Sequence, residues 1–485
     1  MNTSITRTLG SPQVFWSQDY SPGGLSVEDV VSLLGKGTPR RGHSLARGIH
    51  NIPPYHTLES DKKGKLTQKR TSYLGSLPTS PDRDHEPSPL RLAKVIRASV
   101  REIARKYQRV GLMLSGGFDS TLLAFLLKEA GVEVFTYTAE SPGACGPKEW
   151  NFSRQVANSL GFPCTRIEVG SEHLESIRNK LLFGYPSPTI CWVTGSQHRI
   201  AERALADGCQ CLVSGIGSDE ALGGYHKSSR YAWRFGKYQD SFGPDLAWRA
   251  LLDDKGGRQR LMSIGQCCPF PRYALKRLFP GADVDTCLDQ DVKDIYHDVW
   301  QSNPLTDITA AILQTELELR MADILLPELQ AASQEFHITV EYPFLHPDVL
   351  SMAAQIPIAW KYRYGSCPEL LRRPGTKAID KLILRLAFQD ILPGFVHDRP
   401  RNTFTLPFGF WLRQGDSLKK ELDGILGSTL WRHCGADVTA LPSLLKGTLT
   451  GDPWTLPFRI WVAGRLCAWW DSGGLDRLNK ASLRF

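Results

Sequence analysis

The sequence predicts an α/β protein: a parallel sheet with helices on both faces, a helical C-terminal part and a small N-terminal segment. Between residues 90 and 213, apolar runs typical of strands alternate with amphipathic runs typical of helices. This alternation indicates a parallel sheet that is covered on both sides. After about residue 225 the pattern becomes helical and rich in Trp, Arg and Tyr. Residues 1–89 are instead rich in Pro, Gly, Ser and basic side chains.

The elements of the main domain, residues 90–485, follow one another in a regular order. An amphipathic helix is expected over 90–106, after a linker at 78–89 that contains Pro, Asp and Ser. The later strands and helices are expected at 110–114, 121–127, 131–138, 148–160, 164–169, 196–207 and 209–213. Crossovers between parallel strands are right-handed, so the loops after the strands lie along one edge of the sheet. We expect the ligand site at that edge.

The bulk composition is that of a soluble globular protein. The chain has 485 residues, of which 41% are apolar and 22% are charged, and no apolar run approaches the ~20 residues of a membrane span. The N-terminus has no apolar stretch after its first charge, so we expect no signal peptide. The 11 cysteines form no CxxC pair, which indicates reduced thiols and a cytoplasmic protein. A net charge of +8 is modest for this length and suits a small anionic ligand rather than nucleic acid.

A glycine-rich turn, Ser115–Ser120, joins the first predicted strand to the next helix and reads Ser-Gly-Gly-Phe-Asp-Ser. Two glycines let the backbone close on a phosphate, and the first free N–H groups of the helix point at it. Ser115 and Ser120 add hydroxyl groups. Asp119 would repel a bare phosphate, so we expect it to bind a magnesium ion that lies between them. The turn is not a Walker loop, which requires a Lys-Ser/Thr pair after its last glycine.

This turn resembles the pyrophosphate loop of the ATP pyrophosphatases, which split ATP into AMP and pyrophosphate. A second segment, Val213–Tyr225, is similar to the corresponding segment of the asparagine synthetases and again follows a buried-looking strand. The resemblance implies an adenine-nucleotide α-hydrolase-like fold with ATP and Mg²⁺ as cofactors. Asp119 and Asp219 would be the metal ligands, meeting at the carboxyl edge of the sheet. The nucleotide would be held by Ser115, Gly116, Gly117, Asp119, Ser120, Gly215 and Gly217.

Further segments fit the same family in the family's order. Val340–His346 resembles its "PFLD" turn with His in place of Asp, and Gly375–Arg385 resembles its lysine-rich helix before "LP". Ile391–Pro393 and Arg399–Phe404 follow. The resemblance extends from about residue 48 to about residue 470 and is specific at the superfamily level.

The resemblance also implies a chemistry. Family members transfer a carboxylate to the α-phosphate of ATP, which provides the acyl group with a good leaving group. The family's catalytic lysine follows "LP"; here that position holds Arg401, which keeps the charge but cannot shuttle a proton. Lys381, or less favourably Lys377, is expected to take over part of that work. Glu328 lies within one residue of an acidic family position and is the expected general base for the attacking amine.

The N-terminal segment contains one recognisable piece. Gly48–His56 resembles the end of the glutaminase domain of asparagine synthetases. We therefore interpret residues 1–89 as a truncated remnant of that domain and a linker. The family's glutaminase uses an N-terminal cysteine, whereas this chain has Asn2 and its first cysteine is Cys145. We expect no production of ammonia from glutamine.

The resemblance leaves several functions open. The leading one is a glutamine-independent amide synthetase of natural-product biosynthesis, either a lasso-peptide macrolactam cyclase or a β-lactam synthetase. Ile216 replaces the Glu of asparagine synthetases and the Tyr of β-lactam synthetases, while His346, which is shared with lasso cyclases, slightly favours the first version. The substrates would be a small-molecule or peptide carboxylate and an amine, with a precursor peptide and its leader peptidase as expected partners. The alternatives are an ammonia-dependent asparagine synthetase and a non-catalytic nucleotide-binding relative.

Overall fold

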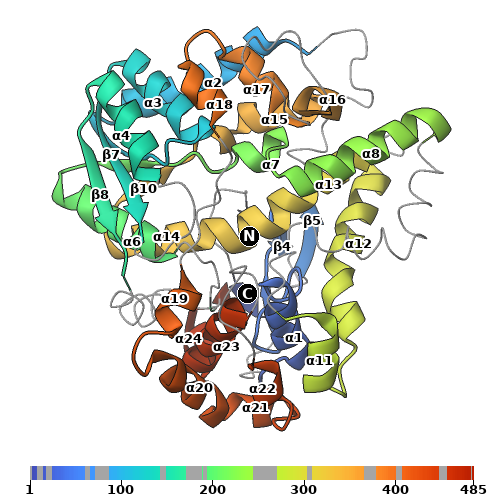
Figure 1. Ribbon diagram of the computed structural model, residues 1–485. Coiled ribbons are helices and arrows are strands. Elements are labelled where there is room, and N and C mark those ends of the chain that lie inside the picture. The colour runs from blue at the N-terminus through green and yellow to red at the C-terminus, as the bar shows by residue number, and fades with distance from the viewer. Residues whose placement is uncertain are drawn as a thin grey trace.

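The computed structural model describes residues 3–7, 15–17, 24–60, 66–70, 87–141, 149–170, 188, 194–243, 270–302, 308–364, 378–399, 407–446, 456–481 and 483–484. The main domain contains a parallel sheet of five strands in the order β10-β9-β6-β7-β8, at the upper left of the view in Figure 1. These strands are β6 (Arg109–Met113), β7 (Glu133–Glu140), β8 (Cys164–Glu168), β9 (Cys211–Val213) and β10 (Thr339–Glu341).

The helices that come before and between these strands along the chain are α2 (Pro89–Lys106), α3 (Phe118–Ala130), α4 (Glu149–Leu160), α6 (Thr194–Ala206) and α7 (Ser218–Leu222). The helices that follow are α8 (His226–Phe242), α11 (Arg272–Leu278), α12 (Val284–Ser302), α13 (Ile308–Thr315), the π-helix η1 (Glu316–Leu325) and α14 (Leu326–Glu335). The last three form one long rod across the centre of the molecule (Figure 1).

The C-terminal part is mainly helical. After β10 come η2 (Pro343–Leu345), α15 (Pro347–Gln355), α16 (Ile358–Lys361), β11 (Tyr362–Tyr364), β12 (Ala378–Asp380), α17 (Leu382–Ala387) and α18 (Gly394–Asp398). The end of the chain contains α19 (Phe408–Leu412), α20 (Ser417–Gly427), α21 (Leu430–His433), α22 (Leu441–Leu444), α23 (Leu456–Asp471), α24 (Gly474–Ala481) and β13 (Leu483–Arg484). No helix in the described part of the chain is long and apolar enough to cross a membrane.

The strands divide their side chains between two cores. Leu112, Cys211 and Val213 belong to a core that α2, α3 and α4 complete on one face. Tyr137 and Leu212 belong to a second core on the other face, together with α6 and the C-terminal helices. Because successive residues of a strand point to opposite faces, both faces must be apolar, and both are covered by helices.

The predicted fold class, a parallel sheet with helices on both faces and a helical C-terminal part, is confirmed. Some boundaries differ. Helix α3 begins at Phe118 rather than at residue 121, so Asp119 lies in its first turn. Strand β10 was not predicted, because three residues are too few to show a period, and only their pairing with Cys211–Val213 on β9 makes them a strand.

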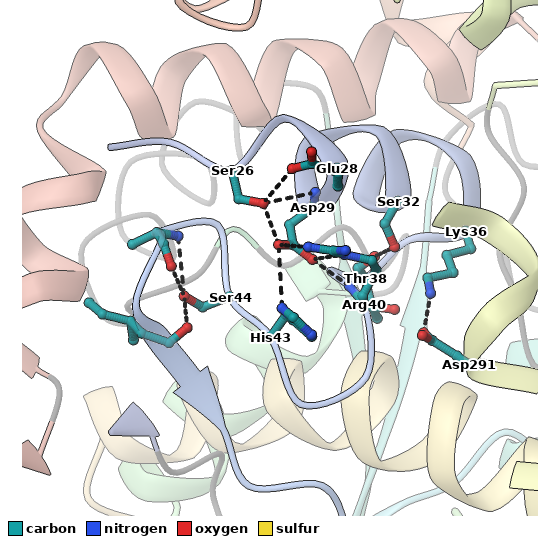
Figure 2. A network of polar contacts seen from close by, with 12 residues as sticks. Ser26, Glu28, Asp29, Ser32, Lys36, Thr38, Arg40, His43, Ser44 and Asp291 are labelled. Atoms are coloured by element: carbon teal, nitrogen blue, oxygen red, sulfur yellow. Dashed lines mark hydrogen bonds and ion pairs between the residues drawn. The ribbon is translucent and has the colours of Figure 1, made fainter. Parts of the chain in front are cut away.

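The N-terminal segment packs against the main domain. It contains β1 (Thr3–Arg7), β2 (Phe15–Ser17), α1 (Val27–Lys36), β3 (Ile49–Asn51), β4 (His56–Ser60) and β5 (Leu66–Arg70), and β2 pairs with β13 at the other end of the chain. Figure 2 shows the polar network at α1, in which Ser26 caps the helix and Arg40 makes paired hydrogen bonds to the buried Asp29. In the same view, Lys36 forms a buried ion pair with Asp291 of α12.

Candidate active site

The turn between β6 and α3 has the shape of an anion-binding loop. Gly116 has a φ of 69°, and a Cβ there would lie 2.7 Å from the Cβ of Phe152, so only glycine fits. The N–H of Ser115 donates to Ser120 Oγ (3.2 Å), and the N–H of Gly117 donates to Ser115 Oγ (3.2 Å). The two serines therefore brace the loop. The first N–H groups of α3, which have no partner within the helix, are the donors that an anion would meet there.

The second predicted loop packs directly against the first. Ser218 Oγ donates a hydrogen bond of 2.7 Å to Asp119 Oδ1, across 99 residues of sequence. A Cβ at Gly215 would lie 3.3 Å from the Cβ of Asp119. Gly217 has a φ of 99°, and a Cβ there would come within 2.4 Å of Leu345, so this glycine lets the loop approach the turn at η2. The two loops thus meet at the carboxyl ends of the adjacent strands β6 and β9.

Lys381 joins the two predicted metal ligands. Its Nζ lies 2.5 Å from Asp119 Oδ2 and 2.7 Å from Asp219 Oδ1. The lysine side chain is 4% exposed, whereas the two aspartates are 22% and 28% exposed. The ammonium group therefore lies between two carboxylates that open toward solvent, while its aliphatic stem is buried.

Backbone geometry at two positions holds this trio together. Lys381 lies just before α17 with φ 50° and ψ 39°, the left-handed conformation that non-glycine residues seldom adopt. The second position is Gly224, where a Cβ would lie 1.8 Å from Asp219 Oδ1 and 2.3 Å from Lys381 Cε. Only a glycine at residue 224 leaves room for the carboxylate and the lysine stem.

Arg399 is a site residue that sequence reasoning missed. Its Nη1 donates a hydrogen bond of 2.8 Å to the carbonyl of Ser115, and its guanidinium lies 4.5 Å over the ring of Phe152. Its Nη2 is 3.9 Å from Glu149 Oε1. Burial raises the pKa of Glu149 to about 7 against the opposing charge of Arg399, and the same burial lowers the pKa of Arg399. The only signal in the sequence was its place two residues before Arg401.

A largely buried layer of polar side chains, made of Glu220, Tyr225, Glu316 and Arg320, lies behind Asp219. Tyr225 donates a hydrogen bond of 2.7 Å to Glu220, and burial, reinforced by the charge of Asp219, raises the pKa of Glu220 to about 7. The guanidinium of Arg320 on η1 lies 4.4 Å over the Tyr225 ring and pairs at 2.9 Å with Glu316. The layer connects the π-helix to the loop that positions Asp219.

The structure describes only some of the other predicted site residues. Arg401 and Lys377 lie outside the described residues. The backbone of Glu328 is in the first turn of α14, and its side chain is outside the described set. Ile216 is half-buried against the core that contains α2 and α3. His346 is the N-cap of α15, which assigns it a structural role. The catalytic roles of Arg401, Lys381 and Glu328 remain predictions.

The donor set near Lys381 fits a magnesium ion that is held jointly with phosphates. Within the described parts of the chain, no cluster of three or more His, Cys, Asp and Glu side chains could hold a metal by itself. Two carboxylates beside a loop of anion-binding shape are nevertheless the hard oxygen ligands that Mg²⁺ prefers, and such an ion would complete its coordination with phosphate oxygens and water. Asp119 and Asp219 meet this requirement, because both lie within 2.7 Å of one central ammonium group.

Comparison with known proteins identifies the family of this chain. Residues 91–445 match the sequence model of the asparagine synthase family. This chain belongs to the asparagine synthase family. All the loops and the lysine described above lie within the matched residues, so the family's sequence pattern and the geometry of the site concern the same part of the chain.

Two relatives show how far the sequence of this chain has diverged from other sequences that resemble it. A Mycobacterium tuberculosis protein, named provisionally as a glutamine-hydrolysing asparagine synthetase, is 23% identical over 403 residues, which cover 77% of this chain and 57% of the relative. Asparagine synthetase 1 of Bacillus subtilis, also named as glutamine-hydrolysing, is 22% identical over 339 residues, covering 67% of this chain and 51% of the relative. The chain therefore spans little more than half the length of these relatives.

Two solved structures are similar to a smaller part of the chain. The NH3-dependent NAD synthetase of Campylobacter jejuni matches 28% of this chain and 61% of its own, with 21% identity and a TM-score of 0.21. NMN synthetase of Francisella tularensis matches 29% of this chain and 59% of its own, with 15% identity and a TM-score of 0.23.

Proposed function

We propose that this protein is an ATP-dependent ligase that adenylates a carboxylate, releases pyrophosphate and joins the acyl group to an amine. The observation that supports this most is the meeting of Asp119, Asp219 and Lys381 beside the loop at the start of α3. Two carboxylates, one ammonium group and a row of backbone N–H groups provide both signs of charge that a metal-bound triphosphate requires.

The reaction proceeds in two displacements. An oxygen of the substrate carboxylate attacks the α-phosphorus of ATP, the bond to the bridging oxygen breaks, and pyrophosphate leaves with the electron pair. The amine then attacks the carbonyl carbon of the acyl-adenylate, AMP leaves, and the amine proton passes to a base, for which Glu328 is our candidate. A bound magnesium ion would neutralise charge on the phosphates as pyrophosphate leaves.

Residues of this chain would position the triphosphate of ATP for the reaction. The N–H groups of the loop at the start of α3 and the side chain of Arg399 would bind the pyrophosphate as it leaves. Arg399 is placed for this because it already lies against the loop, where it donates to the carbonyl of Ser115. Arg401, which follows in the sequence, is proposed to clamp pyrophosphate and the developing oxyanion by charge alone. Asp119 and Asp219 would hold the metal ion.

Within this chemistry, we propose a glutamine-independent amide synthetase of natural-product biosynthesis, of the lasso-peptide cyclase or β-lactam synthetase type. Ile216 lies half-buried on the loop before Asp219 and offers no ionisable group to the substrate pocket. An ammonia-dependent asparagine synthetase would need a polar side chain there for its aspartyl substrate, so it is the less favoured reading.

The experiment is ATP–pyrophosphate exchange with the purified full chain against candidate carboxylic acids, together with chromatography of the spent nucleotide. We expect exchange with one acid and AMP, not ADP, as the nucleotide product. ADP as the main product would contradict the proposal.

Asp119→Asn and Asp219→Asn are the matched inactive variants. Each removes one metal ligand and leaves Lys381 paired with the other carboxylate, so the fold should survive while turnover falls at least ~100-fold. Near-normal turnover by either variant, with unchanged thermal stability, would show that the aspartate has no part in the reaction.

A further inference from the structure

Lys381 occupies the position that a metal ion shared by Asp119 and Asp219 would take. Its Nζ is within 2.7 Å of an oxygen of each carboxylate, and the group is almost completely shielded from water. The stem is confined between these carboxylates and the backbone at Gly224, where no Cβ could fit. The trio is therefore a built site for one cation, and that cation is supplied by the chain.

Two cations cannot share this space. A magnesium ion requires its oxygen ligands at about 2.0–2.1 Å. An ammonium group that keeps its hydrogen bonds to Asp119 Oδ2 and Asp219 Oδ1 would lie almost on top of an ion bound by the same two oxygens, with full like-charge repulsion. Lys381 must therefore leave this position before these two oxygens can bind a metal.

We propose that Lys381 is an exchangeable counter-ion: it neutralises the two aspartates in the nucleotide-free protein and moves to the phosphates when metal-bound ATP arrives. This inference rests on the proposed function, because it assumes that the ligand is a metal–nucleotide complex. The lysine stays at the same site throughout, since it directly precedes α17, and only its long side chain has to move. The metal alone binds weakly because it must displace an ammonium group, whereas metal–ATP gives that ammonium group a new partner.

The test measures metal binding without nucleotide. Mn²⁺ is the probe, because its electron paramagnetic resonance signal reports free ion directly, and the protein is the purified full chain. Lys381→Met removes the competing charge, so we expect Mn²⁺ to bind at least about tenfold more tightly than to the wild type. The same variant should lose at least about tenfold in ATP–pyrophosphate exchange, because the phosphates lose a cation.

The opposite signs of these two effects distinguish exchange from a simple structural role. Mn²⁺ affinity in Lys381→Met that is equal to or below that of the wild type overturns the proposal. Lys381→Gln serves if the methionine variant does not fold, since the amide can donate to both carboxylates while carrying no charge, and it should also tighten Mn²⁺ binding. If the wild type shows no nucleotide exchange at all, the proposed function fails, but the comparison of Mn²⁺ affinities still decides the role of Lys381.

Lys36→Met is the matched control. Lys36 is also a buried lysine with a carboxylate partner, Asp291, but it lies on α1 in the N-terminal segment. Its replacement should lower thermal stability and leave both Mn²⁺ affinity and pyrophosphate exchange unchanged. Asp219→Asn should weaken Mn²⁺ binding, which shows that the measured ion sits between the two aspartates.

Discussion

At the residue scale, Arg399 and Glu149 form a part of the site where burial shifts the pKa of both groups. The guanidinium contacts the loop carbonyl of Ser115 and the ring of Phe152, while Glu149 lies 3.9 Å from its Nη2. A carboxyl with a pKa of about 7 beside the loop at the start of α3 is partly protonated near neutral pH. It therefore imposes less negative charge on an arriving phosphate than an ordinary glutamate would.

Arg399→Met should impair nucleotide use. The change removes the donor to Ser115 and the cation that pairs with Glu149, so we expect ATP–pyrophosphate exchange to fall by about 10–100-fold with a raised KM for ATP. Arg399→Lys keeps the charge and loses the planar fork, so it should retain an intermediate rate.

Arg109→Met is the control for Arg399→Met. Arg109 also contacts a glutamate, Glu133 at 2.8 Å, and an aromatic ring, Phe135 at 5.2 Å, but at the opposite end of β6. Its replacement should leave exchange kinetics unchanged. Equal kinetic losses in the two arginine variants would show that Arg399 acts only through general stability.

Glu149→Gln should change how stability depends on pH. The pKa of Glu149 rises from 4.5 to about 7 on folding, so between these values the folded state binds more protons than the unfolded state. The contribution that protonated Glu149 makes to the stability of the wild type at low pH is therefore lost as the pH rises from 4.5 toward 7. Glutamine imitates the protonated carboxyl, so relative to the wild type the variant should gain on the order of 3 kcal/mol of unfolding free energy between pH 4.5 and 7.5. Urea unfolding at several pH values measures this, and parallel pH curves for the two proteins would contradict it.

At the scale of elements, the π-helix η1 is the unusual piece of the long rod from Ile308 to Glu335. π-Helical turns are rare and occur often at functional sites. Here η1 places Arg320 against Tyr225, and Tyr225 holds Glu220, the neighbour of Asp219 in the sequence. The rod thus packs against the segment that carries Asp219, the second of the two proposed metal ligands.

Tyr225→Phe tests this support. The variant loses the hydroxyl that donates to the buried Glu220, so we expect a loss of about 1–3 kcal/mol in unfolding free energy together with a raised KM for metal–ATP. Tyr107→Phe is the matched control, because its hydroxyl donates in the same way to Glu341, at 2.9 Å, on strand β10. The control should lose stability without any change in KM; a KM effect of the same size in both variants would argue against a specific role for the layer behind Asp219.

At the scale of the whole molecule, buried charges fasten the N-terminal segment to the main domain. Arg7 of β1 pairs with Asp323 of η1 at 3.0 Å and donates to the carbonyl of Ala322. Arg41 pairs with the fully buried Glu318 of the same π-helix at 2.7 Å. Because buried charges require their partners, the segment and the rod are expected to unfold together.

Arg41→Met should destabilise the whole protein. Removing the arginine leaves a buried carboxylate without its principal cation, which costs about 3 kcal/mol or more. Arg101→Met is the control: it breaks an exposed pair with Glu129 and should cost less than about 1 kcal/mol. Differential scanning calorimetry of both variants measures the difference. A separate early transition of the N-terminal segment, with the main transition unchanged, would contradict joint unfolding.

Much of the fold and part of the site could be predicted from the sequence. The alternation of apolar and amphipathic runs is a local property, and it sufficed for the parallel sheet, its covered faces and the two loops at its carboxyl edge. Asp119 and Asp219 were predicted to meet because each follows a strand, and Lys381 was a candidate from the family's pattern. The roles of Arg401 and Glu328 stay predictions.

Which side chains meet across the chain depends on tertiary packing that the sequence pattern does not reveal. Lys381 lies 262 residues from Asp119, and no periodicity or motif specifies that its ammonium group falls between both aspartates. Arg399 and the charges that tie the N-terminal segment to η1 were not foreseen for the same reason. Such pairings depend on how the crossovers and the long rod place distant segments, whereas periodicity and turn motifs are encoded in neighbouring residues. Local sequence patterns therefore specify the sheet and the edge where the candidate site lies, whereas the packing of remote elements specifies which charged groups that site contains.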